Sequence, residues 1–307
     1  MTATSGELHQ LQTVDGSRVQ YRRWLPTGDL RATVQLVHGA SEHSGRYDRL
    51  ATGLALHGFG VWAMDLRGHG RTAESTGIGR FGDGLGVETV LHDVDALHLV
   101  IADQHPGIPR ILLGHSMGSV IALESAERNG GDLAGLVLSG PIGVSPQLAD
   151  TVTLLEEAVA AGAADQALDA LGPFNERFQP ARTRYDWLSR DAAEVDKYVT
   201  DPLSGDDMPL TVAYAAGVFA LAVRAATPEA VAKLPDGLPV LLLSGQHDPV
   251  GGEDAVQVTA LAQLFTERGL PVQQHVYSEA RHEVFNETNR DEVVGDLLAW
   301  LEARLGS

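Results

Sequence analysis

The chain has 307 residues, 44% of them hydrophobic, which suffices for one large core or a core with an inserted subdomain. Its formal net charge of −19 repels nucleic acid and anionic headgroups, so we expect no nucleic acid partner and at most transient contact with membrane or micelle surfaces. The chain has no cysteine, which excludes disulfides, thiolate catalysis and cysteine-bound metals.

Two observations predict a cytoplasmic protein. Residues 1–10 have neither the basic start nor the apolar stretch of a signal peptide. The longest apolar run, 209–223, is shorter than the roughly 20 residues that span a bilayer.

The first third of the chain alternates strand-like and helix-like segments. A hairpin is predicted around the turn dipeptide Asp15-Gly16. The elements after it follow from short apolar runs and from apolar residues spaced three or four apart. They are strands at 32–37 and 61–64, helices at 46–57 and 87–101, and a glycine-rich loop at 66–86.

A short apolar strand, a sharp turn and a helix follow one another at 110–128. Residues 111–113 are all apolar, residues 114–118 read Gly-His-Ser-Met-Gly, and a helical pattern starts at Val120. This order is the context of the G-x-S-x-G nucleophile elbow. We therefore predict that Ser116 is a nucleophile, held in a strained backbone conformation at the positive end of a helix.

The alternation stops after a short strand at 136–138 and returns with a strand at 239–243. Between these strands we expect helices and no strand, and afterwards alternation again. The helices expected between the two strands are 152–159, 167–171, 190–198 and 210–223. After the second strand we expect a helix at 256–265, a strand at 272–277 and a helix at 293–305.

This arrangement predicts an α/β fold with a mostly parallel sheet and helices on both faces. We expect a core made by residues 1–144 and 236–307, and a helical cap made by 145–235 over the carboxyl edge of the sheet, where ligands bind. The segment 210–223 is apolar on nearly all sides, which favours a buried helix. The alternatives are a helix that lines an acyl tunnel or one that rests on lipid.

A serine hydroxyl needs a base within hydrogen-bonding reach and a group that orients this base. In sheets of this kind the order along the chain is serine, acid, histidine, each at the carboxyl end of a strand. His282 is the histidine that lies between the last expected strand and the last expected helix. Asp248 follows the strand at 239–243 in a loop bounded by glycine and proline. We predict His282 as the base and Asp248 as the group that fixes its tautomer.

Two backbone N–H groups should bind the oxyanion. One is expected from Met117, which follows the nucleophile, and the other from Ala40, in the loop after the strand at 32–37. His38, in the same loop, is expected to be a structural hydrogen-bonding group.

Four stretches resemble signatures of the monoacylglycerol lipases and related lysophospholipase-like α/β-hydrolases. They are HGASEHSGRY at 38–47, DLRGHG at 65–70, GHSMG at 114–118 and HEVFNE at 282–287. The cap stretch 184–191 is similar to bacterial esterases. The resemblance implies an α/β-hydrolase fold and carboxylic ester hydrolysis, with the Ala40 and Met117 amides as oxyanion donors.

The resemblance also suggests that Glu42 and Arg46 contact the glycerol end of a substrate. The alternative is a salt-bridged pair that supports the loop. Two positions depart from the family. Ser119 stands where many members have a second glycine after the elbow, and Phe285 stands where mammalian monoacylglycerol lipases have a second histidine near the headgroup.

The predicted function is hydrolysis of lipid-type carboxylic esters, with monoacylglycerols as substrates and an acyl-enzyme on Ser116. No cofactor or metal is expected. A lysophospholipase, a short- or medium-chain carboxylesterase and an aminopeptidase are the alternatives among enzymes. The alternative from another class is a hydrolase fold that serves as a ligand receptor without catalysis.

Overall fold

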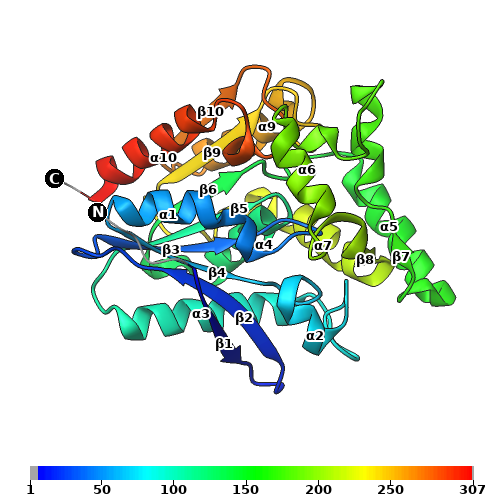
Figure 1. Cartoon of the computed structure of the whole chain (residues 1–307), viewed down its shortest axis with the longest axis horizontal. Coiled ribbons are helices and arrows are strands. Elements are labelled where there is room, and N and C mark those ends of the chain that lie inside the picture. Colours follow the sequence, from blue (N-terminus) through cyan, green and yellow to red (C-terminus); the bar gives the residue numbers. More distant parts are fainter. Residues whose placement is uncertain (1–5, 306–307) are drawn as a thin grey trace.

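The computed structural model describes residues 6–305 and is built on one eight-stranded sheet (Figure 1). The strand order is β1-β2-β4-β3-β5-β6-β9-β10. The pairs β1–β2 and β2–β4 are antiparallel, and all pairs from β4 to β10 are parallel. The strands are β1 (Glu7–Gln12), β2 (Arg18–Trp24), β3 (Ala32–Val37), β4 (Phe59–Met64), β5 (Arg110–His115), β6 (Leu133–Ser139), β9 (Val240–Gly245) and β10 (Val272–Tyr277).

Helices cover both faces of the sheet because its central strands are apolar on both sides. In β5, Ile111 and Leu113 pack into one core cluster and Leu112 into the other. In Figure 1, α1 and α10 lie above the sheet and α3 lies below it. The helices of the first face are α1 (Asp48–Leu56) and α10 (Arg290–Leu305). The helices of the second face are α3 (Glu88–Gln104), α4 (Met117–Asn129) and α9 (Val256–Glu267). The short helix α2 (Ala73–Thr76) lies in the glycine-rich loop. The expected α/β class, with a mostly parallel sheet, is confirmed.

The chain between β6 and β9 lies at one end of the sheet, on the right of Figure 1. We propose that residues 145–235 of this segment form a cap on a core made by 1–144 and 236–307. Residues 1–5 and 306–307, which belong to the proposed core, lie outside the described residues. Residues 1–5 are also the first half of the segment 1–10 that was compared with a signal peptide. The elements of the segment are α5 (Leu148–Ala158), β7 (Ala167–Leu168), α6 (Ala192–Thr200), β8 (Leu210–Thr211), α7 (Val212–Ala225) and α8 (Pro228–Val231).

The expectation of a helix at 167–171 was wrong. Ala167 and Leu168 instead pair antiparallel with Thr211 and Leu210, which makes a short ribbon of β7 and β8. The pairing joins residues more than 40 positions apart, and such contacts leave no periodicity in the local sequence. The helix expected from residue 210 consequently begins at Val212, where the Thr211 side chain accepts a hydrogen bond from the Tyr214 amide and caps it.

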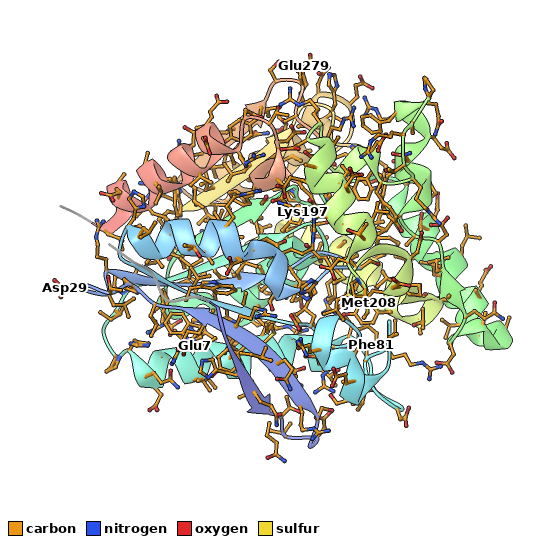
Figure 2. The ribbon with its side chains drawn as sticks, viewed as in Figure 1. Glu7, Asp29, Phe81, Lys197, Met208 and Glu279 are labelled. Atoms are coloured by element: carbon orange, nitrogen blue, oxygen red, sulfur yellow. The ribbon has the colours of Figure 1, made fainter. Side chains whose placement is uncertain are left out.

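The apolar helix α7 is largely buried, as favoured above. Eight of its fourteen residues are buried, and Tyr214 stacks on Phe81 of the glycine-rich loop with 4.1 Å between ring centroids. Phe81 is labelled in Figure 2, where the cap side chains approach this loop. Among the residues that the structure describes, no helix is both long and apolar enough to span a membrane.

A buried carboxyl on α4 predicts a dependence of stability on pH. Glu127 is 6% exposed, and its Oε1 has no hydrogen-bond partner in the described part of the chain. Burial, together with the nearby Glu124 carboxylate, raises the pKa of Glu127 to about 8. Between the usual pKa near 4.5 and about 8, the unfolded chain releases this proton while the native chain keeps it. The free energy of unfolding therefore falls as the pH rises through this window and then levels off.

We expect Glu127→Gln to remove this loss. The variant should match the parent near pH 4.5 and exceed its stability by a few kcal/mol, on the order expected for a shift of this size, above pH 8. Urea unfolding at several pH values measures the difference. Glu157→Gln, at an exposed position of α5, serves as the control. A difference between Glu127→Gln and the parent that does not grow with pH would contradict the argument.

Candidate active site

Ser116 lies at a sharp turn between β5 and α4, with the strained backbone that the motif predicts. Its φ is 53° and its ψ is −122°, a conformation that non-glycine residues rarely adopt. The two motif glycines allow the close packing of this turn. A Cβ on Gly114 would lie 2.2 Å from the Gly118 carbonyl oxygen, and a Cβ on Gly118 would lie 2.1 Å from the Val37 carbonyl oxygen. Ser116 is the residue before α4, so it lies at the amino-terminal end of that helix, where the helix dipole is positive.

His282 and Asp248 meet in the loops that follow β10 and β9. The Nδ1 atom of His282 lies 2.9 Å from Oδ2 and 3.0 Å from Oδ1 of Asp248, although the residues are 34 positions apart. Asp248 is fully buried after β9, and its Oδ1 also accepts a hydrogen bond from the Val250 amide at 2.9 Å. With Nδ1 donating to the carboxylate, Nε2 is the free nitrogen of the neutral ring and can accept a proton.

The surroundings of His282 determine how readily it accepts that proton. Burial lowers the pKa of His282, but the Asp248 carboxylate outweighs this effect, and the net result is a pKa above the ordinary value. The neighbouring His115 differs, because burial and then His282 lower its pKa to about 4. His115 is therefore neutral near pH 7, and His282 is the ring suited to proton transfer.

The structure brings Ser116 and His282 to the same site but records no hydrogen bond between them. Ser116 packs against Gly39: a Cβ atom added to Gly39 would lie 3.1 Å from the Cβ of Ser116. His282 lies next to His115, the residue before Ser116, with 4.8 Å between ring centroids. Catalytic hydrogen bonds are often long or misaligned in unliganded enzymes and shorten when substrate binds.

The loop after β3 carries the second expected oxyanion donor. Ala40 and Met117 line the same cavity as Ser116. The loop is held by buried hydrogen bonds, since the Gly39 amide donates to Oε1 of Glu42 at 2.6 Å and Nε2 of His38 accepts from the Leu66 amide at 2.9 Å. His38 is thus the structural hydrogen-bonding group that the sequence predicts.

The cavity at Ser116 is apolar and small. Apart from Ser116, its lining consists of apolar and aromatic residues and includes no charged side chain. Its volume is about 40 Å³, enough for roughly one water molecule. Pockets that hold drug-sized ligands measure roughly 300–1,000 Å³, so this cavity must enlarge before an acyl chain enters. The lining residues are Ala40, Ser116, Met117, Ile142, Ala170, Leu171, Phe174, Trp187, Leu210, Ala215, Val218, Phe219 and Val250.

Glu42 and Arg46 form a buried ion pair. Arg46 Nη1 lies 2.6 Å from Oε2 of Glu42, and the Arg46 guanidinium makes two further bonds to Glu283, at 2.6 and 2.8 Å. Burial of Glu42 is outweighed by Arg46, so that the pKa of Glu42 falls to about 2. Neither residue lines the Ser116 cavity. This arrangement favours the second of the two alternatives, a pair that supports the loop, and it ties the Ala40 loop to the residue after His282.

Comparisons with known proteins identify the family of this chain. Residues 28–289 match the model of the family described as serine aminopeptidase, S33. The chain belongs to this family. The monoacylglycerol lipase of Mycolicibacterium smegmatis is 31% identical over 99% of this hydrolase and 100% of its own length. The monoglyceride lipase of Mus musculus is 30% identical over 98% of this hydrolase and 92% of its own length.

Among solved structures, the hydrolase is similar to a thermostable carboxyl esterase from Bacillus coagulans in complex with glycerol. The TM-score is 0.90 at 28% identity, over 99% of this chain and 100% of that chain. The α/β-hydrolase fold and the resemblance to monoacylglycerol lipases are thereby confirmed, and the protein is a carboxylic ester hydrolase.

The two departures from the family motifs have structural consequences. Phe285 is 6% exposed and packs in the core cluster beneath α1 and α10, away from the cavity. Ser119 replaces a glycine without disturbing the elbow, because its hydroxyl donates to the Ser116 carbonyl at 2.5 Å and accepts from the Ile142 amide at 3.3 Å.

Two neighbours of His282 have roles that the sequence does not predict. Glu283 belongs to the motif at 282–287 and binds Arg46. Trp187 belongs to the esterase-like stretch at 184–191, and its ring centroid lies 4.9 Å from that of His282. The motif HE at 282–283 could have indicated the first, whereas the second depends on how the cap folds over the core.

Proposed function

We propose that the hydrolase cleaves monoacylglycerols through an acyl-enzyme on Ser116. The observation that carries the proposal is the joint position of three features: a strained serine elbow, a buried His282–Asp248 pair and an uncharged apolar cavity at the same serine. The first two supply nucleophilic catalysis, and the third suits the acyl chain of a lipid ester. The monoacylglycerol and monoglyceride lipases among the relatives support the choice of substrate.

In the proposed mechanism, Ser116 Oγ attacks the ester carbonyl carbon while its proton passes to Nε2 of His282. The Ala40 and Met117 amides donate hydrogen bonds to the resulting oxyanion. The tetrahedral intermediate collapses, the bond to the alcohol oxygen breaks, and His282 gives its proton to that oxygen. Water then gives its proton to His282 and attacks the acyl group, the bond to Ser116 Oγ breaks, and fatty acid leaves. Throughout, Asp248 holds the ring and stabilises the imidazolium.

The lining of the cavity supports a neutral ester over the charged rival substrates. An aminopeptidase must bind the charged α-ammonium of its substrate, and a lysophospholipase must accommodate a phosphate. No carboxylate and no cationic side chain line the Ser116 cavity, and an unpaired charge next to it would be strongly destabilising. A neutral glycerol ester carries neither charge. We also propose a cytoplasmic location.

A substrate panel tests the proposal. We expect kcat/KM for monoacylglycerols to exceed that for lysophospholipids by about tenfold or more, because a site that leaves a charge unpaired discriminates at least this strongly. Aminoacyl anilides should not be cleaved. A fluorophosphonate should label Ser116 stoichiometrically in the folded protein. Hydrolysis restricted to short p-nitrophenyl esters would favour a general carboxylesterase, and failure to label would favour a receptor without catalysis.

A further inference from the structure

Trp187, in the segment between β6 and β9, packs against the His282 ring in a tilted arrangement. The indole and imidazole centroids are 4.9 Å apart with an interplanar angle of 36°, and Trp187 is 2% exposed. His115 lies on the imidazole at 4.8 Å. Phe174 contacts Trp187 at 5.0 Å and also lines the Ser116 cavity. Trp187 is thus the cap side chain that makes a ring contact with His282.

Backbone hydrogen bonds fix this tryptophan to the loop that carries His282. The His282 amide donates to the Trp187 carbonyl at 3.4 Å, and the Glu283 amide donates to the Leu188 carbonyl at 2.8 Å. The Arg281 guanidinium donates to the carbonyls of Asp186 and Ser189, on either side. The position of the indole relative to the imidazole is therefore determined by the backbone as well as by ring packing.

The face of an indole ring attracts a cation that lies within about 6 Å of its centroid. Above its pKa, His282 is neutral in the resting enzyme and becomes a cation when it takes the proton from Ser116 or from water. At that moment Asp248 faces its Nδ1 atom, with the carboxylates of Glu283 and Glu42 further away, while His115 is neutral. An attraction that exists only for the imidazolium lowers the barrier rather than strengthening substrate binding.

We propose that Trp187 is a positioning residue for the catalytic base: its indole face stabilises the imidazolium of His282 and holds this ring against Asp248. The inference rests on the proposed function, and it assigns to the cap a part in the rate of turnover. The cap then acts on the base as well as on the acyl chain.

Two substitutions separate the ring face from the bulk of the side chain. Trp187→Phe keeps an aromatic face, and Trp187→Leu keeps an apolar side chain without one. With p-nitrophenyl butyrate, whose short acyl group depends little on the cavity, we expect Trp187→Leu to lower kcat by about 3- to 30-fold. We also expect the acidic limb of its pH profile to move down by about half a unit to one unit, because the imidazolium is less stable. Trp187→Phe, whose ring face attracts a cation less strongly than indole, should lie between the parent and Trp187→Leu in both.

Phe174→Leu is the matched control. It removes a ring from the same cavity and from the other side of Trp187 while leaving the contact with His282. It should change KM for long acyl esters and leave the acidic limb in place. A Trp187→Leu variant with an unmoved acidic limb, or a Trp187→Phe variant as impaired as Trp187→Leu, would overturn the proposal.

Two further measurements complete the test: the first leaves the shape of the side chain unchanged, and the second does not require turnover. Replacing tryptophan by 5-fluoro- and then 5,7-difluorotryptophan in the parent chain weakens the ring face without changing its shape, and kcat should fall stepwise. NMR of ring-labelled histidine follows the protonation of His282 without turnover. A downward shift in Trp187→Leu supports the contact even if esters prove not to be substrates. If Trp187→Leu leaves the His282 titration unchanged and the enzyme hydrolyses esters, the role of Trp187 is refuted while the proposed function stands.

Discussion

Replacing Ser116 by alanine is expected to lower kcat for monoacylglycerol hydrolysis by about five orders of magnitude. The elbow presents one hydroxyl at the cavity, and without it neither an acyl-enzyme nor its transition state can form. The activity that persists should be about 10³- to 10⁴-fold above the uncatalysed rate, because oxyanion donors and substrate binding remain. Titration of the released fatty acid measures the effect.

The strain at this turn supplies a control for Ser116→Ala. Alanine and serine are both strained at a φ of 53°, so the alanine variant should unfold at nearly the same urea concentration as the parent. Ser116→Gly should be equally inactive but more stable by about 1 kcal/mol, since glycine adopts positive φ without penalty. Activity within tenfold of the parent in either variant would exclude Ser116 as the nucleophile.

The elbow could be predicted because its determinants are local. A strand, two glycines, a serine and a helix follow within 19 residues, and each local preference agrees with the fold. His282 and Asp248 could be named because the chain order of the three groups limits each search to one loop after one strand. Their contact over 2.9 Å then follows from the parallel pairing of β9 and β10.

The cap could not be predicted to the same degree, because its structure depends on non-local packing. The β7–β8 ribbon joins two segments that each read as helix, and Trp187 meets His282 across 95 positions of sequence. The motif at 38–47 led to Glu42 and Arg46, with an ion pair as one of the two alternatives. Its third member, Glu283, comes from the opposite end of the chain. Periodicity identifies which residues are buried but not which partner buries them.

Asp248→Asn is expected to lower kcat by about 10⁴-fold, as the loss of the orienting carboxylate does in other serine hydrolases. Nδ1 of His282 now donates to a carboxylate at 2.9 Å. An asparagine can turn its NH₂ group toward Nδ1, which then accepts and leaves the proton on Nε2. In that tautomer His282 cannot take the proton from Ser116, and no charge stabilises the imidazolium. The measurement combines kcat with the tautomer of His282, read from the NMR shifts of its two ring nitrogens.

Asp254→Asn makes the same chemical change in the same loop at an exposed residue whose carboxylate binds Gln246. It should leave kcat within about twofold of the parent, since exposed hydrogen bonds of this kind contribute little to stability or position. Because Asp248 is fully buried, Asp248→Asn also requires a check by urea unfolding, and a folded variant with the altered tautomer is the expected result. If the folded Asp248→Asn variant keeps the parent's kcat, another group must orient His282. The buried pair of His282 and Asp248 would then serve stability rather than catalysis.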